Sequence, residues 1–246
     1  MSSGNIQLYN ADCFDDLPTL ASGSVDLICA DIPYGTTQCS WDTSLDLPRM
    51  WLELYRVAKP SAAIVLFSAQ PFTRVLVSSN LRHWRTEWIW EKGNATGFLN
   101  AKKQPLRAHE NIQVFYRRQP TYNPQFTHGH ARKVSRRKTV NSECYGKALE
   151  LTQYDSTSRY PRDVQFVSSD KQLGNFHPTQ KPLALVKYII ETYSNPGDVV
   201  MDFTMGSGTT GVACQETGRP FIGIEKETPI YQTACQRMGI KRERAA

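Results

Sequence analysis

The amino-acid sequence predicts an α/β fold with a mostly parallel central sheet. Short apolar runs alternate along the chain with stretches whose apolar residues recur at helical spacing. Several of these runs are apolar at consecutive positions, which is typical of parallel strands covered by helices on both faces. One run near the C-terminus ends in a glycine turn that opens a helix. Strands and helices in such alternation favour a layered α/β protein.

The expected strands are short apolar runs, at 6–9, 25–30, 62–68, 87–90, 111–116, 198–203 and 220–225. The expected helices lie between them, at 48–58, 71–80, 182–193, 209–217 and 228–238. Pro48 and Pro71 suit the first turn of a helix, where the missing N–H costs nothing. In the third helix Leu183, Val186 and Ile189 share one face, which predicts packing against the sheet.

A polar and basic segment from about 118 to 176 interrupts this rhythm. It shows no sustained period, and a long irregular segment inside a compact domain is usually functional or disordered. A chain of 246 residues is long enough for one domain with an insertion. We therefore expect a single domain in two halves, 1–117 and 177–246, separated by an insert.

Composition excludes several classes of protein. The chain is 40% apolar and 21% charged, as soluble globular proteins are. Its longest clean apolar run, 62–67, is too short to cross a bilayer, and residues 1–5 open no signal-peptide pattern. The six cysteines form no CxxC pair, so neither a metal site nor a disulfide framework is expected. A cytoplasmic protein with reduced thiols is the expectation.

The positive charge is concentrated in one segment. The net charge is +6, yet residues 102–138 hold ten Lys or Arg against a single acid, Glu110. This segment alone carries +9 and leaves −3 for the rest of the chain. A polyanionic partner is the natural hypothesis, and a solvated loop without a partner is the alternative.

A glycine turn in residues 197–227 suggests a nucleoside cofactor. Gly206 and Gly208 allow a tight turn and close approach to a ligand, and the helix that follows has free N–H groups. Asp202 precedes the turn, and Glu225 ends the next strand, where an acid can accept hydrogen bonds from ribose hydroxyls. There is no GxGxxG and no GxxxxGK[ST], which disfavours dinucleotides and nucleoside triphosphates.

Together with the run that ends in Asp31-Ile32-Pro33-Tyr34, this turn resembles a known family, the S-adenosylmethionine-dependent DNA amino-methyltransferases of the β group. The tetrapeptide is similar to the D-P-P-Y motif of that family. HPTQKP (177–182) is similar to H-P-T-x-K-P, and DFTMGSGTT (202–210) to D-P-F-x-G-S-G-T-T. YNADCFDDL (9–17) resembles the opening segment that contacts the cofactor adenine. The catalytic motif comes first, which is the β-group order.

The resemblance implies a Rossmann-like class I methyltransferase fold with circularly permuted motif order and an inserted target-recognition segment at about 118–176. It implies that the catalytic residues are Asp31, Ile32, Pro33 and Tyr34. It implies S-adenosylmethionine contacts from Asp12, Cys13, Lys181, Asp202, Phe203, Gly206, Ser207, Gly208, Thr209, Thr210 and Glu225. In the insert, a basic run fits contacts to DNA phosphates by Arg132, Lys133, Arg136, Arg137 and Lys138.

The chemistry of an exocyclic amine explains the tetrapeptide. Its lone pair delocalises into the base ring, so acceptors on its two N–H groups are needed to make the nitrogen pyramidal. The Asp31 carboxylate can accept one N–H and the Ile32 carbonyl the other, while Pro33 restricts the turn. The Tyr34 ring offers a flipped base a face on which to stack.

The sequence departs from the family pattern at two places. Ile32 stands where the first proline of the motif is usual, which keeps the backbone carbonyl but makes the backbone that carries it less rigid. Phe203-Thr204 stands where Pro-Phe is usual, which leaves open which side chain packs against the cofactor. Asp12 can also be read as the cap of a following turn. His177 is read as a structural loop residue and Trp41 as a packing residue.

Alternatives remain open at this point. In the β group an aspartate often leads the motif of adenine enzymes and a serine that of cytosine enzymes, so Asp31 favours adenine N6 over cytosine N4. An RNA-base methyltransferase does not account for the permuted order. A catalytically inactive DNA-binding relative is disfavoured by the intact Asp31 and Tyr34. A restriction–modification, phage or free-standing enzyme, and a monomer or homodimer, are all compatible with the sequence.

Overall fold

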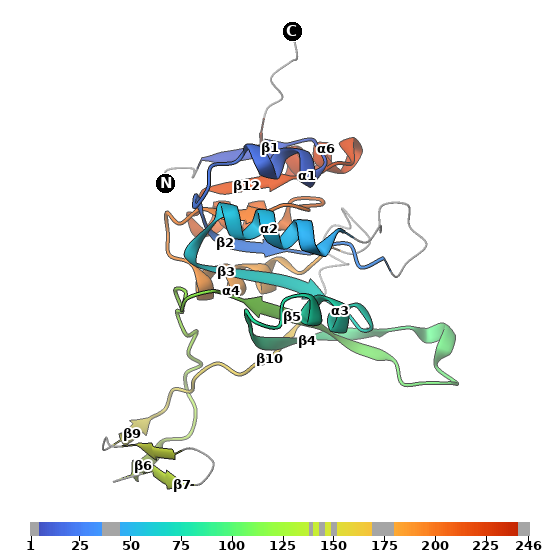
Figure 1. Ribbon diagram of the computed structural model, residues 1–246. Coiled ribbons are helices and arrows are strands. Elements are labelled where there is room, and N and C mark those ends of the chain that lie inside the picture. The colour runs from blue at the N-terminus through green and yellow to red at the C-terminus, as the bar shows by residue number, and fades with distance from the viewer. Residues whose placement is uncertain are drawn as a thin grey trace. The chain divides into compact units, whose positions relative to one another are not determined.

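The computed structural model describes residues 5–35, 45–137, 140–142, 146–148, 152–168 and 180–240 (Figure 1). The chain divides into two compact units. The main unit comprises Met1–Asn123 and Asp163–Ala246, and the small unit comprises Pro124–Arg162. The small unit lies within the expected insert but is narrower than it.

The main unit contains an eight-stranded sheet in the order β1-β12-β11-β2-β3-β5-β4-β10. Its strands are β1 Ile6–Tyr9, β2 Val25–Ala30, β3 Ala58–Ser68, β4 Trp84–Thr96, β5 Arg107–Phe115, β10 Val164–Val167, β11 Val200–Asp202 and β12 Phe221–Ile224. Neighbours from β1 to β3 pair in parallel, β5 is antiparallel to both β3 and β4, and β10 is parallel to β4. The prediction of an α/β fold with a mostly parallel sheet is confirmed.

Helices cover both faces of this sheet. They are α1 Cys13–Asp16, α2 Leu47–Val57, α3 Phe72–Ser79, α4 Leu183–Tyr193, α5 Thr209–Thr217 and α6 Thr228–Arg237, with the 3-10 turns η1 Leu17–Thr19 and η2 Phe98–Asn100. Figure 1 shows α2 and α3 in front of the sheet and α4 behind it. None of the helices in the described ranges is long and apolar enough to cross a membrane.

Alternation along β3 explains why its sequence is apolar at consecutive positions. Ile64 and Leu66 are buried in the core with α2 and α3, whereas Ala63, Val65 and Phe67 are buried in the core with α4 and α5. Each strand residue therefore loses its water on one face or the other, at about 25 cal/mol of stabilisation per Å² of apolar surface. The double-sided core is the physical reason for the apolar runs that predicted the strands.

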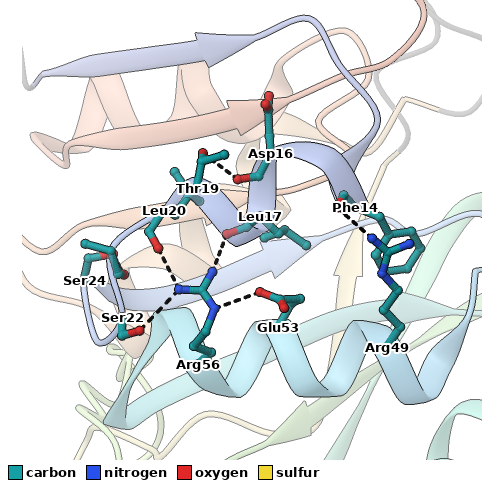
Figure 2. A network of polar contacts seen from close by, with 11 residues as sticks. Phe14, Asp16, Leu17, Thr19, Leu20, Ser22, Ser24, Arg49, Glu53 and Arg56 are labelled. Atoms are coloured by element: carbon teal, nitrogen blue, oxygen red, sulfur yellow. Dashed lines mark hydrogen bonds and ion pairs between the residues drawn. The ribbon is translucent and has the colours of Figure 1, made fainter.

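Two arginines of α2 hold the segment that follows β1 (Figure 2). The Arg56 guanidinium donates hydrogen bonds to the backbone carbonyls of Leu17 and Leu20 and pairs with Glu53. Arg49 donates to the Phe14 carbonyl at 3.0 Å, and its guanidinium lies 4.5 Å from the centre of the Phe14 ring. These charge-assisted bonds to carbonyls fix α1 and η1 on α2, and with them the wall of the cavity described below.

The sheet also contains elements that the sequence did not predict. The expected strands at 87–90 and 111–116 are only the buried parts of β4 and β5, which continue outward as a long exposed hairpin. β10 was not expected because it is an edge strand whose Val164 and Phe166 are exposed. A strand of this kind has no continuous apolar run, since only one of its faces and one of its edges is covered.

The small unit consists of short antiparallel pairs. β6 Lys133–Arg137 pairs with β9 Thr152–Ser156, and β7 Val140–Ser142 pairs with β8 Gly146–Ala148. The expectation that this stretch lacks regular structure is wrong for these strands. Their sequences are mostly polar, so the pairing comes from backbone hydrogen bonds and leaves little hydrophobic signal.

Candidate active site

A cavity of about 650 Å³ opens at the carboxyl ends of the parallel strands of the main unit. Asp12 and Cys13 follow β1, residues 31–34 follow β2, Asp202 ends β11 and Glu225 follows β12, and all of them line the cavity. The carboxyl ends of parallel strands share one edge of a sheet, and ligands of open α/β proteins bind at that edge. Both halves of the chain therefore contribute to one site.

The Asp31 carboxylate lies at this edge with both oxygens engaged. The Tyr34 hydroxyl donates to Oδ1 at 2.8 Å, and the Lys181 ammonium donates to Oδ2 at 2.6 Å. The side chain remains 29% exposed toward the cavity. Burial, with the nearby charge of Glu110, raises the pKa of Asp31 above its ordinary value, although Lys181 counteracts the shift.

Lys181 joins two carboxylates. Its Nζ lies 2.6 Å from Asp31 Oδ2 and 3.1 Å from Glu110 Oε2, and Lys92 pairs with the other oxygen of Glu110 at 2.5 Å. Burial alone would lower the pKa of Lys181, but the two carboxylates raise it, so the ammonium stays charged. Burial alone would raise the pKa of Glu110, but the two lysines hold it below its ordinary value. The site thus contains two acids and two cations in one connected group.

The turn after β2 is anchored on its apolar side. Ile32 is buried in the core, and the Tyr34 ring stacks on Phe72 with ring centres 5.3 Å apart and planes 20° apart. The Thr204 hydroxyl donates to the Asp31 backbone carbonyl at 3.2 Å. One face of Tyr34 is therefore covered by Phe72, and the Lys181 ammonium lies 5.9 Å from the centre of the Tyr34 ring.

The two glycines of the 202–210 loop have different roles. Both have positive φ, 54° for Gly206 and 82° for Gly208. A Cβ on Gly208 would lie 2.9 Å from Met238 Cε and 3.0 Å from Ala234 Cβ, whereas a Cβ on Gly206 would meet nothing within 4 Å. Gly208 is not among the residues that line the cavity. Its small size allows α6 to pack closely against the loop, and its predicted contact with the cofactor stays a prediction.

Two acids fix the conformation of this loop. The Asp202 carboxylate accepts from the Thr210 hydroxyl at 2.7 Å and from the Thr204 N–H at 3.1 Å. Burial raises the pKa of Asp202 to about 7. The Glu225 carboxylate accepts from the Gly206 N–H at 3.0 Å and from the Glu227 N–H at 2.8 Å, and burial raises its pKa. Desolvated carboxylates at a cavity wall favour a cationic ligand, whose charge would stabilise theirs.

Asp12 caps α1 and also lies in the wall of the cavity. Its carboxylate accepts from the Phe14 N–H at 2.9 Å. Cys13 is buried behind it, where burial and the charge of Asp12 raise the pKa of the thiol to about 12. The thiol is therefore a neutral wall of the cavity and not a nucleophile.

Comparison with known proteins identifies the family. The family profile described as DNA methylase, for N6 and N4 methyltransferases, matches residues 25–236. The chain belongs to this family. Type II methyltransferase M.HinfI of Haemophilus influenzae is 28% identical over an alignment of 264 positions that covers 94% of this chain and 67% of the relative. The family uses S-adenosylmethionine as its methyl donor, so the chain is a β-group DNA amino-methyltransferase with that donor.

Solved structures share the fold of this methyltransferase. The crystal structure of the M1.HpyAVI–SAM complex is 26% identical, with a TM-score of 0.68 and coverage of 95% of this chain and 98% of that chain. The cytosine-N4-specific PvuII DNA methyltransferase is 14% identical, with a TM-score of 0.68 and coverage of 99% and 89%. At 14% identity the likeness shows the fold alone. The Rossmann-like class I fold is thus confirmed.

Most residues predicted for the site lie around the cavity of the methyltransferase. Apart from Gly208, all the predicted catalytic and cofactor residues line it. Lys181, which was also predicted to contact the cofactor, donates a hydrogen bond from its ammonium to Asp31. Ser207 and Thr209 present hydroxyls that accept from the Arg237 guanidinium at 2.9 and 3.2 Å. His177 and Trp41 lie outside the described residues.

Sequence reasoning missed several residues of the site. Glu110 is a strand residue of β5, Phe72 begins α3, and Arg237 ends α6. None belongs to a motif, and each reaches the site only through tertiary packing. One signal was available, since Glu110 is the single acid in the basic stretch 102–138 and an isolated acid there suggests a specific partner.

The predicted DNA contacts lie in the small unit. Arg132, Lys133 and Arg136 are exposed on or beside β6. The Arg132 guanidinium already forms a bidentate pair with Asp155, at 2.8 and 2.7 Å. Water screens an ion pair on an exposed surface, so a DNA phosphate can compete with Asp155 for Arg132. Arg137 belongs to β6, and Lys138 lies outside the described residues.

Proposed function

We propose that this methyltransferase transfers the methyl group of S-adenosylmethionine to the exocyclic N6 of an adenine flipped out of duplex DNA. The observation that carries the proposal is the identity of the residue at the head of the motif. An aspartate occupies it, and its carboxylate faces the cavity where the motif turn and the glycine loop meet. In the β group an aspartate at this position is associated with adenine enzymes.

Asp31 is suited to hold the target amine. Each carboxylate oxygen has a second lone pair, so Asp31 can accept an amine N–H while Tyr34 and Lys181 keep their bonds. The Ile32 carbonyl supplies the second acceptor. With both N–H groups held, the nitrogen lone pair is directed out of the base plane, and the raised pKa of Asp31 makes it a better acceptor for the proton that the amine loses.

The residues around the glycine loop fit S-adenosylmethionine. When bound, it supplies an electrophilic methyl group on a positively charged sulfur. Asp202 and Glu225 are desolvated acids at the cavity wall, and the first N–H groups of α5 suit a carboxylate. We assign the contacts to Asp12, Cys13, Asp202, Phe203, Gly206, Ser207, Thr209, Thr210 and Glu225.

Glu225→Ala is expected to weaken S-adenosylmethionine binding by about 1–3 kcal/mol, a rise in Kd of about 5- to 150-fold. The change removes the acceptor for the ribose and also the bonds that hold the Gly206 and Glu227 N–H groups. Calorimetry of the purified variant measures the effect. Glu216→Ala is the matched control, because Glu216 pairs with Lys187 outside the cavity and should leave Kd unchanged. An unchanged Kd for a folded Glu225→Ala protein would remove Glu225 from the cofactor site.

The small unit is proposed as the target-recognition segment. Its exposed cations, Lys133 and Arg136, fit phosphates, and Phe126 and Tyr160 form an exposed aromatic pair with ring centres 4.5 Å apart. Phosphate contacts position a protein on DNA, while contacts to base edges specify the sequence. The polyanionic partner suggested by the charge distribution is therefore DNA.

The methylated base is the direct test of the proposed function. Mixed-sequence duplex DNA is incubated with the purified protein and S-adenosylmethionine, then digested and analysed by mass spectrometry. N6-methyladenine is the expected product. N4-methylcytosine would contradict the adenine assignment and leave the chemistry at the amine in place. No methylated nucleoside at all would favour a catalytically inactive DNA-binding protein. Single-molecule sequencing of the same DNA gives the recognition site.

A further inference from the structure

We propose that the tip of the β4–β5 hairpin, residues 97–107, is a wedge that enters duplex DNA beside the target base pair. This inference rests on the proposed function, because it supplies the step by which the target base leaves the stack. The small unit carries the predicted DNA contacts, and the hairpin belongs to the main unit. The wedge is therefore a second, separate DNA-contacting element.

The position of the hairpin supports this role. β4 and β5 pair from the core out to Thr96 opposite Arg107, and their outer parts are exposed on both strands. Figure 1 shows the hairpin extending past the end of β3. Asn94, Thr96, Arg107 and His109 line the same cavity as Asp31. The tip therefore begins at the rim of the cavity that would receive the base.

The tip presents apolar side chains to water. Phe98 is 77% exposed and Leu99 is 84% exposed. They lie on a short ordered turn, since Gly97 at φ 93° opens η2 and the Ala101 N–H bonds to the Phe98 carbonyl at 3.0 Å. Two adjacent large apolar residues held in this way cost free energy in water unless a partner covers them. Apolar side chains inserted between base steps are a known way to unstack and kink DNA.

The charge of the tip selects the partner. Lys102, Lys103 and Arg107 lie on it, and no Asp or Glu occurs between Glu91 and Glu110. A cationic rim around an apolar centre complements a polyanion whose interior is a stack of bases. Two such tips would repel each other across a two-fold axis, which disfavours a second copy of the chain as the occupant.

The test compares paired with unpaired targets. The turnover of the double variant Phe98→Ser/Leu99→Ser is compared with that of wild type on duplexes that carry the recognition site found by sequencing the methylated DNA. In one duplex the target base is paired, and in the other it lies opposite an abasic position. If sequencing yields no site, mixed-sequence duplexes with and without abasic positions are used, and DNA affinity is the readout. The matched control is Leu52→Ser/Val75→Ser, which removes exposed apolar side chains (69% and 56% exposed) outside the cavity.

We expect the tip variant to lose about 10-fold or more of its turnover, or of its affinity where that is the readout, on the paired duplex. On the abasic duplex, where no pair needs to be opened, it should come within about 3-fold of wild type. The tip variant should bind S-adenosylmethionine with unchanged affinity. The control variant should match wild type on both duplexes. Equal losses on both duplexes, or no loss, would overturn the wedge. A wild-type dimer that the tip variant converts to a monomer would assign the tip to self-association instead and also overturn it. These outcomes test the wedge separately from the adenine assignment, because they are the same whether the methylated base is adenine or cytosine.

Discussion

Replacing Asp31 with alanine is expected to lower the rate of methyl transfer by about 100-fold or more while S-adenosylmethionine still binds. The carboxylate is the acceptor that orients the target amine, and loss of one preorganised hydrogen bond in a transition state has effects of this size. The fold should survive, because Glu110 still neutralises the buried Lys181 ammonium at 3.1 Å. Initial rates on saturating DNA, with calorimetry of S-adenosylmethionine binding, separate the two effects.

The chain offers a matched control for this change on the same strand. Asp26 lies in β2, pairs with Lys59 at 2.7 Å and is not among the residues that line the cavity. Asp26→Ala also removes an aspartate paired with a lysine, so it should cost stability and leave turnover per folded molecule unchanged. An Asp31→Ala enzyme with wild-type turnover would contradict the assignment of the amine acceptor.

Asp202→Asn is expected to remove a specific pH dependence of stability in the protein without bound S-adenosylmethionine. The pKa of Asp202 is about 7 in the folded protein and near 3.8 when unfolded. Between these values the folded state holds the proton more tightly, so this residue makes stability fall as pH rises. From pH 5.5 to pH 8.5 its contribution falls by about 2 kcal/mol, most of it below about pH 7.5.

The measurement is urea unfolding of wild type and variant at both pH values. Asparagine keeps the acceptor for the Thr204 N–H, and the Thr210 hydroxyl can turn to accept from the new amide. The variant should lose about 2 kcal/mol less than wild type between pH 5.5 and pH 8.5. Asp198→Asn, which changes a carboxylate bound to the Asn195 N–H, is the control. Parallel pH dependences for wild type and Asp202→Asn would contradict the raised pKa.

Much of the fold could be predicted because its signals are local. The buried strands β2 and β3 are covered on both faces, so their burial appears in the sequence as unbroken apolar runs. β10 and the strands of the small unit escaped prediction because edge and polar strands are held by backbone pairing to distant partners. The outer parts of β4 and β5 were not predicted for a related reason, since their side chains are exposed and follow no burial pattern.

The candidate site also has features with a local sequence signal and features that depend on residues far apart in the chain. The sequence by itself determined the tetrapeptide at Asp31, the glycine turn and the acid at Glu225, because a tight turn and a strand-end acid each depend on residues close in the chain. Only the tertiary structure decided that Lys181 joins Asp31 to Glu110 and that Gly208 packs against α6. These contacts join residues far apart in the chain, and no local pattern records a contact that forms only when parallel strands bring their carboxyl ends to one edge of the sheet.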